Sequence, residues 1–374
     1  DEEEEEEAEE EEGGVRVAEM RGSAMSMEAA CGSGRGEEEE GATEGRGSRA
    51  RTLRRRQRLL ARMRRHGLPL SASMDDEEGG SSEEEGVVPT WDAAAAAAAT
   101  EEGSGHLPTV SMGAFATEGA RGADRMEDRH FLRPRVLGGR THLCGVLDGH
   151  RGAECAEFGR EALPVGIAAA LKSGLDPRAA LSAAFRAADG AYRAREEQKR
   201  KGATPAGATA IAALVEGANL YVANAGDCRA VLSRGGSALD LTRDHTAEDE
   251  RERLRIASAG GAIERLDTFR VGPARLQVTR ALGDADCKPH GVTAEPEVSA
   301  TAIARGDEFC ILACDGLWDV LSSQEAVDLV RATVKEPSMS AKRLATEAMI
   351  RNSSDNITVL VVFLSPVSTL ERVF

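Results

Sequence analysis

The sequence has no long run of apolar residues, and several familiar motifs are also missing. No segment approaches the 18 or more apolar residues of a membrane-spanning helix, and no signal peptide is visible. There is no CxxC pair, no cluster of Cys and His at zinc-site spacing, and no G-x-G-x-x-G fingerprint. These absences argue against a membrane protein, a zinc domain and a Rossmann unit. The first residue is Asp rather than Met, which leaves open whether a targeting segment precedes it.

Cysteine is scarce, and its seven copies form no disulfide framework. The count is odd, and the chain is not a small secreted scaffold. Cys310 and Cys314 lie four residues apart on a predicted strand, which places them roughly 13 Å apart, too far to bridge. We therefore expect small buried side chains in a reduced, intracellular protein of the cytoplasm, the nucleus or both.

The full chain has a net charge of −17, and most of its acidic side chains lie in the first part. Residues 1–105 hold 28 acidic and 13 basic side chains, so residues 106–374 have a net charge of only about −2. A nearly neutral folded part has no basic excess, which argues against nucleic-acid binding. Nothing in the sequence indicates an oligomer, and we expect a monomer.

The composition divides the chain into three parts. Residues 1–105 are expected to be a disordered acidic tail, because stretches such as DEEEEEEAEEEE cannot bury a core. Residues 106–365 are predicted to form the folded domain, and residues 366–374 a C-terminal tail. A basic island, residues 51–67, interrupts the acidic tail. It is read either as a nuclear localisation patch or basic amphipathic helix, or as a solvated charge run that contacts the acidic tail, and we favour the second.

Short apolar runs with glycine-rich ends follow the acidic tail, together with helical segments that come in groups. Strands are predicted over 141–148, 207–217, 219–226, 229–236, 307–316 and 356–365. Helices are predicted over 152–172, 176–200, 246–259, 323–335 and 339–352. Pro164 is expected to break or restart the first helix. The three successive runs between residues 207 and 236 favour antiparallel hairpins, and the grouping as a whole predicts an α+β fold.

Acidic residues lie at one end of five of the apolar segments. They are Asp148, Asp227, Asp315, Asp355 and the pair Glu127–Asp128. Carboxylates that gather at one edge of a core repel one another unless a cation compensates them. Oxygen ligands without a Cys or His cluster suit Mg²⁺ or Mn²⁺. For Asp227 a second reading is a hairpin turn, because GDCR is also a good turn sequence.

The stretch LCGVLDGHRGAE, residues 143–154, places three candidate site residues side by side: Asp148, Gly149 and His150. Gly149 has no side chain, so its carbonyl can approach an ion beside the Asp148 carboxylate. Two metals about 3.5–4 Å apart activate water and stabilise an in-line displacement at phosphorus. His150, next to Asp148, would then protonate the leaving oxygen.

The chain resembles the metal-dependent protein serine/threonine phosphatases of type 2C, particularly the plant members. The matching stretches are RMEDRH (125–130), GVLDGHRG (145–152), GATA (207–210), NAGDCRAVL (224–232), LTRDHTAEDERERLRIASAGG (241–261), LQVTRALGD (276–284), AEPEV (294–298), DEFCILACDGLWDVLS (307–322) and SSDNITVLVV (353–362). They occur in the family's order and cover essentially all of 106–365. The resemblance implies a four-layer α/β/β/α sandwich of two antiparallel sheets flanked by helices. It also implies hydrolysis of phosphoserine and phosphothreonine in proteins by water activated at two Mg²⁺ or Mn²⁺ ions.

The resemblance assigns the acids to the metal site. The residues implied to hold or support metals are Glu127, Asp128, Asp148, Gly149, Asp227, Asp315 and Asp355. Among them Asp148 bridges the two ions, and Asp227 matches a weaker third-metal position. His150 matches the general acid. Residues 262–284 fall where the family carries its substrate-facing flap.

Two departures from the family pattern concern arginines. The position of the family's phosphate-binding Arg is Ala123 here, flanked by Arg121 and Arg125, and we assign the catalytic phosphate contact to Arg121. Arg151 replaces the family's usual Gly; it could reach the phosphate or point to solvent, and we favour solvent. The alternative function is therefore a catalytically weak or dead homologue that acts as a phosphoprotein-binding regulatory module. The absence of C-x5-R and DxDx(T/V) nucleophile signatures favours direct attack by water.

Two residues near these motifs are read as structural. Asp284 is expected to end a helical turn, and Trp318 to pack in the core.

Overall fold

The computed structural model describes residues 107–139, 141–198, 205–333 and 336–365. The expectations for the acidic tail with its basic island at 51–67, and for the tail at 366–374, lie outside the described residues. The domain limits at 106 and 365 stay predictions. Within the part of the chain that is described, no helix is both long enough and apolar enough to cross a bilayer.

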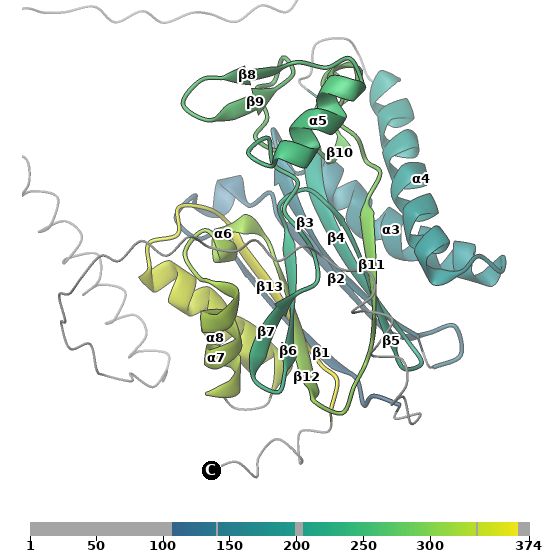
Figure 1. Ribbon diagram of the computed structural model, residues 1–374, viewed down its shortest axis with the longest axis vertical. Coiled ribbons are helices and arrows are strands. Elements are labelled where there is room, and N and C mark those ends of the chain that lie inside the picture. The colour runs from purple at the N-terminus through teal and green to yellow at the C-terminus, as the bar shows by residue number, and fades with distance from the viewer. Residues whose placement is uncertain (1–106, 140, 199–204, 334–335, 366–374) are drawn as a thin grey trace, which may run out of the picture. The chain divides into compact units, whose positions relative to one another are not determined.

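Two antiparallel sheets packed face to face form the centre of the molecule (Figure 1). The first sheet contains, in spatial order, β1 (Ser111–Thr117), β13 (Ile357–Phe363), β12 (Asp307–Ala313), β6 (Arg229–Arg234) and β7 (Ser237–Asp240). The second contains β11 (Glu297–Ala302), β5 (Asn219–Ala225), β4 (Gly207–Glu216), β3 (Thr141–His150) and β2 (Arg129–Val136), with β10 (Leu282–Gly283) beside β4. Adjacent strands in both sheets run antiparallel.

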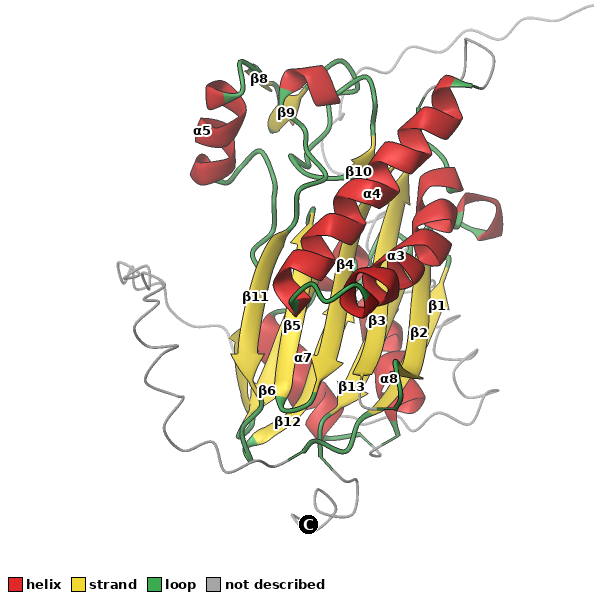
Figure 2. Cartoon of the chain, turned by 90° about the vertical axis from the view of Figure 1, so that its right-hand side faces the viewer, coloured by secondary structure: helices red, strands yellow, loops and turns green. Residues whose placement is uncertain are grey.

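Helices cover the outer face of each sheet. In Figure 2 two of them cross the second sheet, and the other pair is seen behind it, against the first sheet. The four are α3 (Glu154–Lys172) and α4 (Pro177–Glu197) on the second sheet, and α7 (Ser323–Arg331) and α8 (Pro337–Ile350) on the first. The other helical segments are η1 (Ala123–Arg125), α5 (Glu250–Ser258), α6 (Asp315–Trp318) and η2 (Lys288–His290). The predicted α+β fold, a four-layer α/β/β/α sandwich, is confirmed.

The mostly apolar sequence of β13, ITVLVVF, follows from its position inside the sandwich. Leu360 and Val362 face the second sheet, where they pack in the core between the two sheets. Val359 and Val361 face the other way and pack against the layer of α7 and α8. Thr358 is the one polar residue of the strand, and the other positions carry apolar side chains because the strand is buried on both faces. Burial of each such side chain stabilises the fold by about 1.5–3 kcal/mol.

Several helix starts follow from local capping signals. Asp176 precedes α4, and its carboxylate accepts hydrogen bonds from the backbone N–H groups of Arg178 and Ala179 at 3.0 and 3.1 Å. Ser322 precedes α7 and forms a capping box with Glu325. These side chains satisfy N–H groups that have no partner inside the first turn of a helix.

Two expectations about local structure were wrong. Helix α3 continues through Pro164, which costs one backbone hydrogen bond but leaves the buried face of Leu163 and Ile167 intact. The runs β5 and β6 do not form a hairpin, because they belong to different sheets. Gly226, at φ +128°, carries the chain from one sheet to the other, and a Cβ there would lie 2.3 Å from the Thr209 side chain.

The predicted flap, residues 262–284, lies with α5 at the top of Figure 1. It contains the short hairpin of β8 (Ile263–Arg265) and β9 (Phe269–Val271). Ile256 of α5 and Val271 of β9 belong to a small separate core under this region. The flap is therefore packed as a unit of its own beside the ends of the sheets.

Candidate active site

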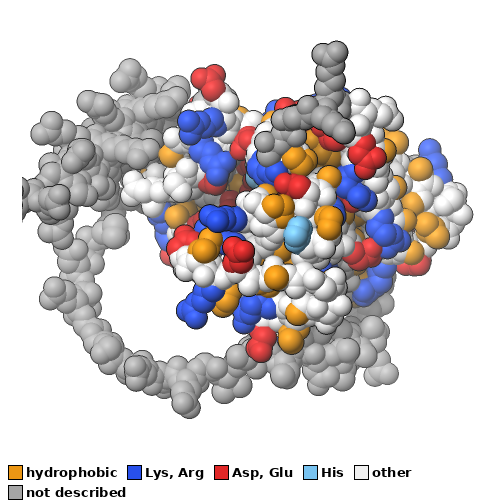
Figure 3. Space-filling model, turned by 90° about the horizontal axis from the view of Figure 1, so that it is seen from above, with side chains coloured by type: hydrophobic (Ala, Val, Ile, Leu, Met, Phe, Trp, Pro, Cys, Tyr) orange, Lys and Arg blue, Asp and Glu red, His pale blue; other side chains and the backbone are white. Residues whose placement is uncertain are grey.

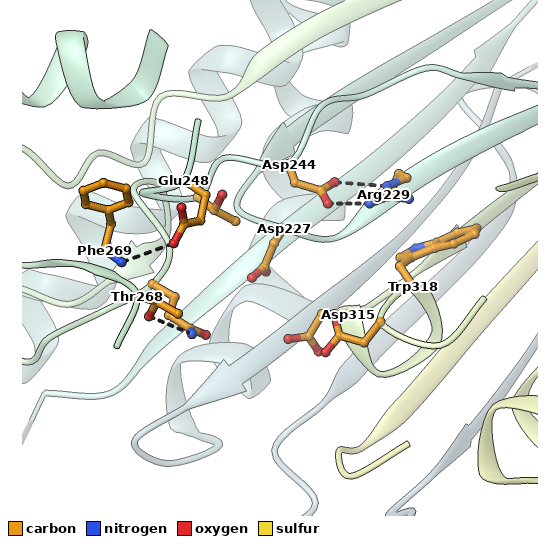
Figure 4. Close-up of a pocket in the computed structure, with 11 residues that line it drawn as sticks. Asp227, Arg229, Asp244, Glu248, Thr268, Phe269, Asp315 and Trp318 are labelled. Carbon is orange, nitrogen blue, oxygen red and sulfur yellow. Dashed lines mark hydrogen bonds and ion pairs between the residues drawn. The ribbon is translucent and has the colours of Figure 1, made fainter. Parts of the chain in front are cut away.

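Three carboxylates from separate segments meet at the end of the sandwich that faces the flap. Asp148 lies near the end of β3, Asp227 on the crossing from β5 to β6, and Asp315 at the start of α6. One carboxylate oxygen from each lies within 4.8 Å of the others. In Figure 4 Asp227 and Asp315 point into a common space. We call these three residues the acid cluster.

The antiparallel pairing explains why distant acids meet. Ala313, the last residue of β12, pairs with Val359 near the start of β13. Asp315 and Asp355 therefore lie at the same end of these two neighbouring strands. In the second sheet the end of β3 pairs with the start of β4 at the same end of the sandwich. Strand ends that adjoin across a sheet bring their flanking residues together regardless of separation in sequence.

The acid cluster is electrostatically strained without a cation. Burial, with the charges of Asp128, Asp315 and Asp227, raises the pKa of the Asp148 carboxyl well above its usual range. Burial and the Asp315 charge raise the pKa of Asp227 in the same direction. Burial and the neighbouring charge of Asp355 raise the pKa of Asp315 to about 7. A divalent cation would hold all of these groups ionised.

The donor set fits a hard divalent cation. All three members of the acid cluster offer carboxylate oxygens, which suit Mg²⁺ or Mn²⁺ rather than a softer metal. The buried Oδ1 atom of Asp315 has no hydrogen-bond partner among the residues that the structure describes, as expected of an atom that ligates a metal. A second group, Asp128, Asp148 and Cys314, has ligand atoms equally close together. In that group the Cys314 thiol donates to Asp128 at 3.2 Å, which makes Asp128 a neighbour of the acid cluster rather than a member.

Gly149 lies against the segment that carries Glu127. A Cβ on Gly149 would lie 2.6 Å from the Glu127 carbonyl oxygen, so only glycine fits this approach. The Glu127 side chain accepts a hydrogen bond from the Gly152 backbone at 2.7 Å. The Glu127 backbone N–H in turn donates to Asn356 at 2.9 Å. Glu127 is thereby held beside both Gly149 and the residue that follows Asp355.

Arg121 points into this site. Its guanidinium donates to Asp355 at 2.6 Å and to Glu127 at 3.3 Å. It is the arginine to which the sequence assigned the phosphate contact. Arg125, the other candidate, lies in η1 and is exposed.

Arg151 does not point to solvent, which corrects the expectation from sequence. Its side chain is only 18% exposed and donates to Asp286 at 3.0 and 2.8 Å. It also donates to Asp284 at 3.2 Å. Asp284 and Asp286, which follow β10, thus hold the guanidinium of Arg151 against the protein surface.

Asp284 was also misread as the end of a helical turn. Its carboxylate is fully buried, and its Oδ2 atom lies 2.7 Å from the His150 Nε2 atom. The sequence offers one signal that could have revealed it, the repeated acid in ALGDAD beside a glycine. Trp318 is buried as expected, and its indole N–H donates to the Ala313 carbonyl at 3.0 Å.

A pocket of about 190 Å³ lies between the acid cluster and the flap (Figure 4). Its lining includes Asp227 and Asp315 on one side and Thr268 and Phe269 of the flap on the other. Asp244, also in the lining, is paired with Arg229 through two hydrogen bonds of 3.2 and 2.6 Å. Figure 3 shows basic and acidic side chains interspersed over the upper face of the molecule. The arrangement leaves room beside the acids for a small group.

Comparison with known proteins gives one consistent family. The family model described as protein phosphatase 2C matches residues 112–357. A "Protein kinase and PP2C-like domain-containing protein" of Oryza sativa subsp. japonica is 48% identical over 284 residues, which are 73% of this chain and 42% of the relative. The "Probable protein phosphatase 2C 22" of Arabidopsis thaliana is 38% identical over 284 residues, 70% of each chain. The chain thus spans less than half the length of the rice relative.

Solved structures agree with the sequence comparison. A serine-threonine phosphatase 2C from Toxoplasma gondii superposes with a TM-score of 0.62 at 25% identity, covering 69% of this chain and 97% of its own. A structure described as a C. elegans sex determining protein gives a TM-score of 0.64 at 26% identity, covering 70% of this chain and 66% of its own.

Proposed function

Because the chain belongs to the protein phosphatase 2C family, we propose that it is an active, metal-dependent protein serine/threonine phosphatase. The observation that carries the proposal is the convergence of Asp148, Asp227 and Asp315 within 4.8 Å from three separate segments. Phosphoproteins are the substrates that this family membership favours. We propose that the acid cluster acts on them together with residues around it.

The residues proposed to hold metal ions are those that the family resemblance implies, and the geometry supports part of that set. Asp148 would serve two ions, since its carboxylate belongs to two groups of close ligand atoms. Gly149 would offer its backbone carbonyl beside it, Asp315 and Asp355 would hold one ion, and Glu127 would act through bound water. Asp355 lies outside the two groups of close ligand atoms and accepts a hydrogen bond from Arg121. When bound, two Mg²⁺ or Mn²⁺ ions supply a low-pKa water and charge stabilisation for displacement at phosphorus.

Arg121 orients the phosphate. Its guanidinium already lies beside the acids, with Asp355 and Glu127 fixing its direction. A planar guanidinium can bind two phosphate oxygens at once and can turn to the substrate without leaving its carboxylate partners. The catalytically dead alternative was motivated by Ala123 at the position of the family's phosphate-binding arginine. Arg121 lies beside the acids and could take that arginine's role.

His150 donates a proton to the leaving oxygen. It follows Gly149 on β3 and is partly exposed, so its ring can reach a substrate oxygen. Seryl and threonyl oxygens are poor leaving groups and need a proton as the phosphorus–oxygen bond breaks. An aryl oxygen leaves without that help. His150 thus favours alkyl phosphates, the chemistry of phosphoserine and phosphothreonine.

The direct test measures phosphate release from a phosphothreonine peptide with Mn²⁺. We expect EDTA to abolish turnover and Asp148→Asn to reduce it to background. Asp267→Asn, an acid of the flap whose side chain is 75% exposed, is the matched control and should keep wild-type activity. Full activity in EDTA or in Asp148→Asn contradicts the mechanism. Peptide binding without phosphate release, measured by calorimetry, would instead support the regulatory module.

The remaining expectations are also part of this proposal. We propose that the folded part acts as a monomer inside the cell on phosphoserine and phosphothreonine proteins, and not on nucleic acid or at a membrane. The partners of the whole protein are a separate matter, since the kinase-containing relatives are more than twice as long as the matched region.

A further inference from the structure

Asp284 is a fully buried carboxylate beside the proposed proton donor. Its Oδ2 atom lies 2.7 Å from His150 Nε2, and its side chain has no exposed surface, whereas His150 is 24% exposed. A buried carboxylate is costly unless it is paired and hydrogen-bonded. Here the partner is the imidazole on which the reaction depends.

The backbone around the pair is built to bring these two side chains together. Strand β10 pairs with the start of β4, opposite the end of β3, so Asp284 arrives beside His150. Asp284 has φ +46°, in the left-handed region that non-glycine residues seldom adopt. A Cβ on Gly207 would lie 2.1 Å from Asp284 Oδ2 and 2.3 Å from His150 Nε2. The contact thus depends on a strained residue, Asp284, and on Gly207, where a side chain has no room. Strained backbone residues are concentrated at functional sites.

Arg151 holds the other oxygen of the same carboxylate. Its Nη1 atom donates to Asp284 Oδ1 at 3.2 Å, while the guanidinium also binds Asp286 at 3.0 and 2.8 Å. With Oδ1 occupied in this way, Oδ2 remains directed at the imidazole. Arg151 also partly compensates the charge of the buried carboxylate.

We propose that Asp284 is a positioning residue that sets the tautomer and direction of the His150 ring, with Arg151 securing Asp284. The inference rests on the proposed function and deepens it. Asp284 accepts the Nε2–H bond, which leaves Nδ1 as the nitrogen that faces the substrate. As the bond between phosphorus and the seryl or threonyl oxygen breaks, the Nδ1 proton passes to that oxygen and the phosphoryl group passes to a water oxygen. The attacking water releases one proton to solvent, and Nδ1 takes up a proton from solvent before the next turnover. The Nε2 proton stays on the ring throughout, against Asp284.

The kinetic test compares two substrates whose leaving groups differ. With Asp284→Ala we expect kcat for a phosphothreonine peptide to fall about 10- to 100-fold, part of the roughly 10²–10⁴-fold that a general acid contributes. Turnover of p-nitrophenyl phosphate should change less than about threefold, since its oxygen needs little protonation. His150→Ala should show the same selectivity, and the double variant should be no worse than His150→Ala alone. Equal losses on both substrates, or additive losses in the double variant, overturn the proposal.

Asp307→Ala is the matched control for the loss of a buried carboxylate. Asp307 is also paired with an arginine, Arg234 at 2.7 Å, but it begins β12 at the opposite end of the strand from Asp315. It should lower stability while leaving the ratio of the two turnover rates unchanged. If Asp284→Ala fails to fold, Asp284→Asn keeps the shape and a neutral acceptor, and it should lower peptide turnover several-fold with little effect on the aryl substrate.

A spectroscopic readout separates this proposal from the proposed function. In ¹⁵N-histidine-labelled, metal-free protein, the His150 Nε2–H resonance should be observable and protected in the wild type and should exchange rapidly in Asp284→Ala. Asp307→Ala should retain it. An unprotected resonance in the wild type refutes the positioning role whatever the activity. A protected resonance in a protein that hydrolyses neither substrate with Mn²⁺ refutes the proposed function and leaves the contact standing.

Discussion

Replacement of Asp148 by Asn should inactivate the protein and yet make its metal-free form more stable. Asp148 is surrounded by the other carboxylates, and burial with their charges raises its pKa well above the usual range. Asn keeps the shape and removes the charge. It can also donate hydrogen bonds to neighbouring carboxylates. The substitution should therefore relieve repulsion that the metal-free fold otherwise bears.

The structure sets the size of the gain. Two charges 4.8 Å apart, the limit within the acid cluster, repel by roughly 3 kcal/mol at the effective dielectric of a protein surface. Proton uptake by the wild-type cluster removes part of this, so we expect a gain of about 1–3 kcal/mol at pH 8. That corresponds to a rise in Tm of about 3–10 °C.

The sign of the pH dependence follows from the raised pKa values. Asp315 titrates at about 7 in the folded protein against 3.8 normally, so its favourable contribution is complete below about pH 4 and is lost as the pH rises through 7. Burial raises the pKa of Asp128 to about 6, with the same sign. The metal-free wild type should therefore lose stability between pH 5.5 and 8. The advantage of Asp148→Asn should be larger at pH 8 than at pH 5.5.

Thermal unfolding in EDTA at both pH values measures these differences, with Asp267→Asn as a matched acid outside the cluster. Added Mn²⁺ should stabilise the wild type by mass action, about 2.7 kcal/mol at one hundred times its Kd, and should stabilise Asp148→Asn far less. If Asp148→Asn were less stable than the wild type in EDTA at pH 8, or if its advantage did not depend on pH, the acid cluster would not be a strained metal site.

Three further predictions concern single contacts. Arg121→Ala should lower kcat/KM for a phosphopeptide by about 10- to 100-fold, the worth of a hydrogen bond to a charged group; steady-state kinetics would refute this if Arg121→Ala matched the wild type while Arg125→Ala did not. Gly149→Ala should weaken Mn²⁺ binding, measured by calorimetry, because its Cβ would lie 2.6 Å from the Glu127 carbonyl oxygen; an unchanged affinity would remove Gly149 from the site. Ser322→Ala should cost about 1 kcal/mol in urea unfolding through loss of the α7 cap, with kcat/KM unchanged; a loss of activity without a loss of stability would contradict a purely structural cap.

The sequence pattern alone determined the α+β class of the fold and the positions of most of the candidate acids, and the resemblance to the family supplied the four layers. Burial on both faces of a central strand requires a run such as that of β13, and this pattern is local to the chain. Asp148 and Asp315 can also be recognised from the local sequence as candidate site residues, because each follows an apolar run. Helix starts such as Asp176–Pro177 depend on contacts within a few residues, so they too were predicted correctly.

Only the tertiary structure decided which side chains meet. Asp227 has a second reading in the sequence as a hairpin turn, and it joins the acid cluster because Gly226 takes the chain across to the other sheet. The contact of His150 with Asp284 spans 134 positions, and that of Arg121 with Asp355 spans 234. Arg151 had no visible partner in the sequence, since Asp284 reaches it only through the pairing of β10 with β4. Hydrogen bonds of this kind depend on position in space to within an ångström, and residue type and spacing along the chain carry no such information.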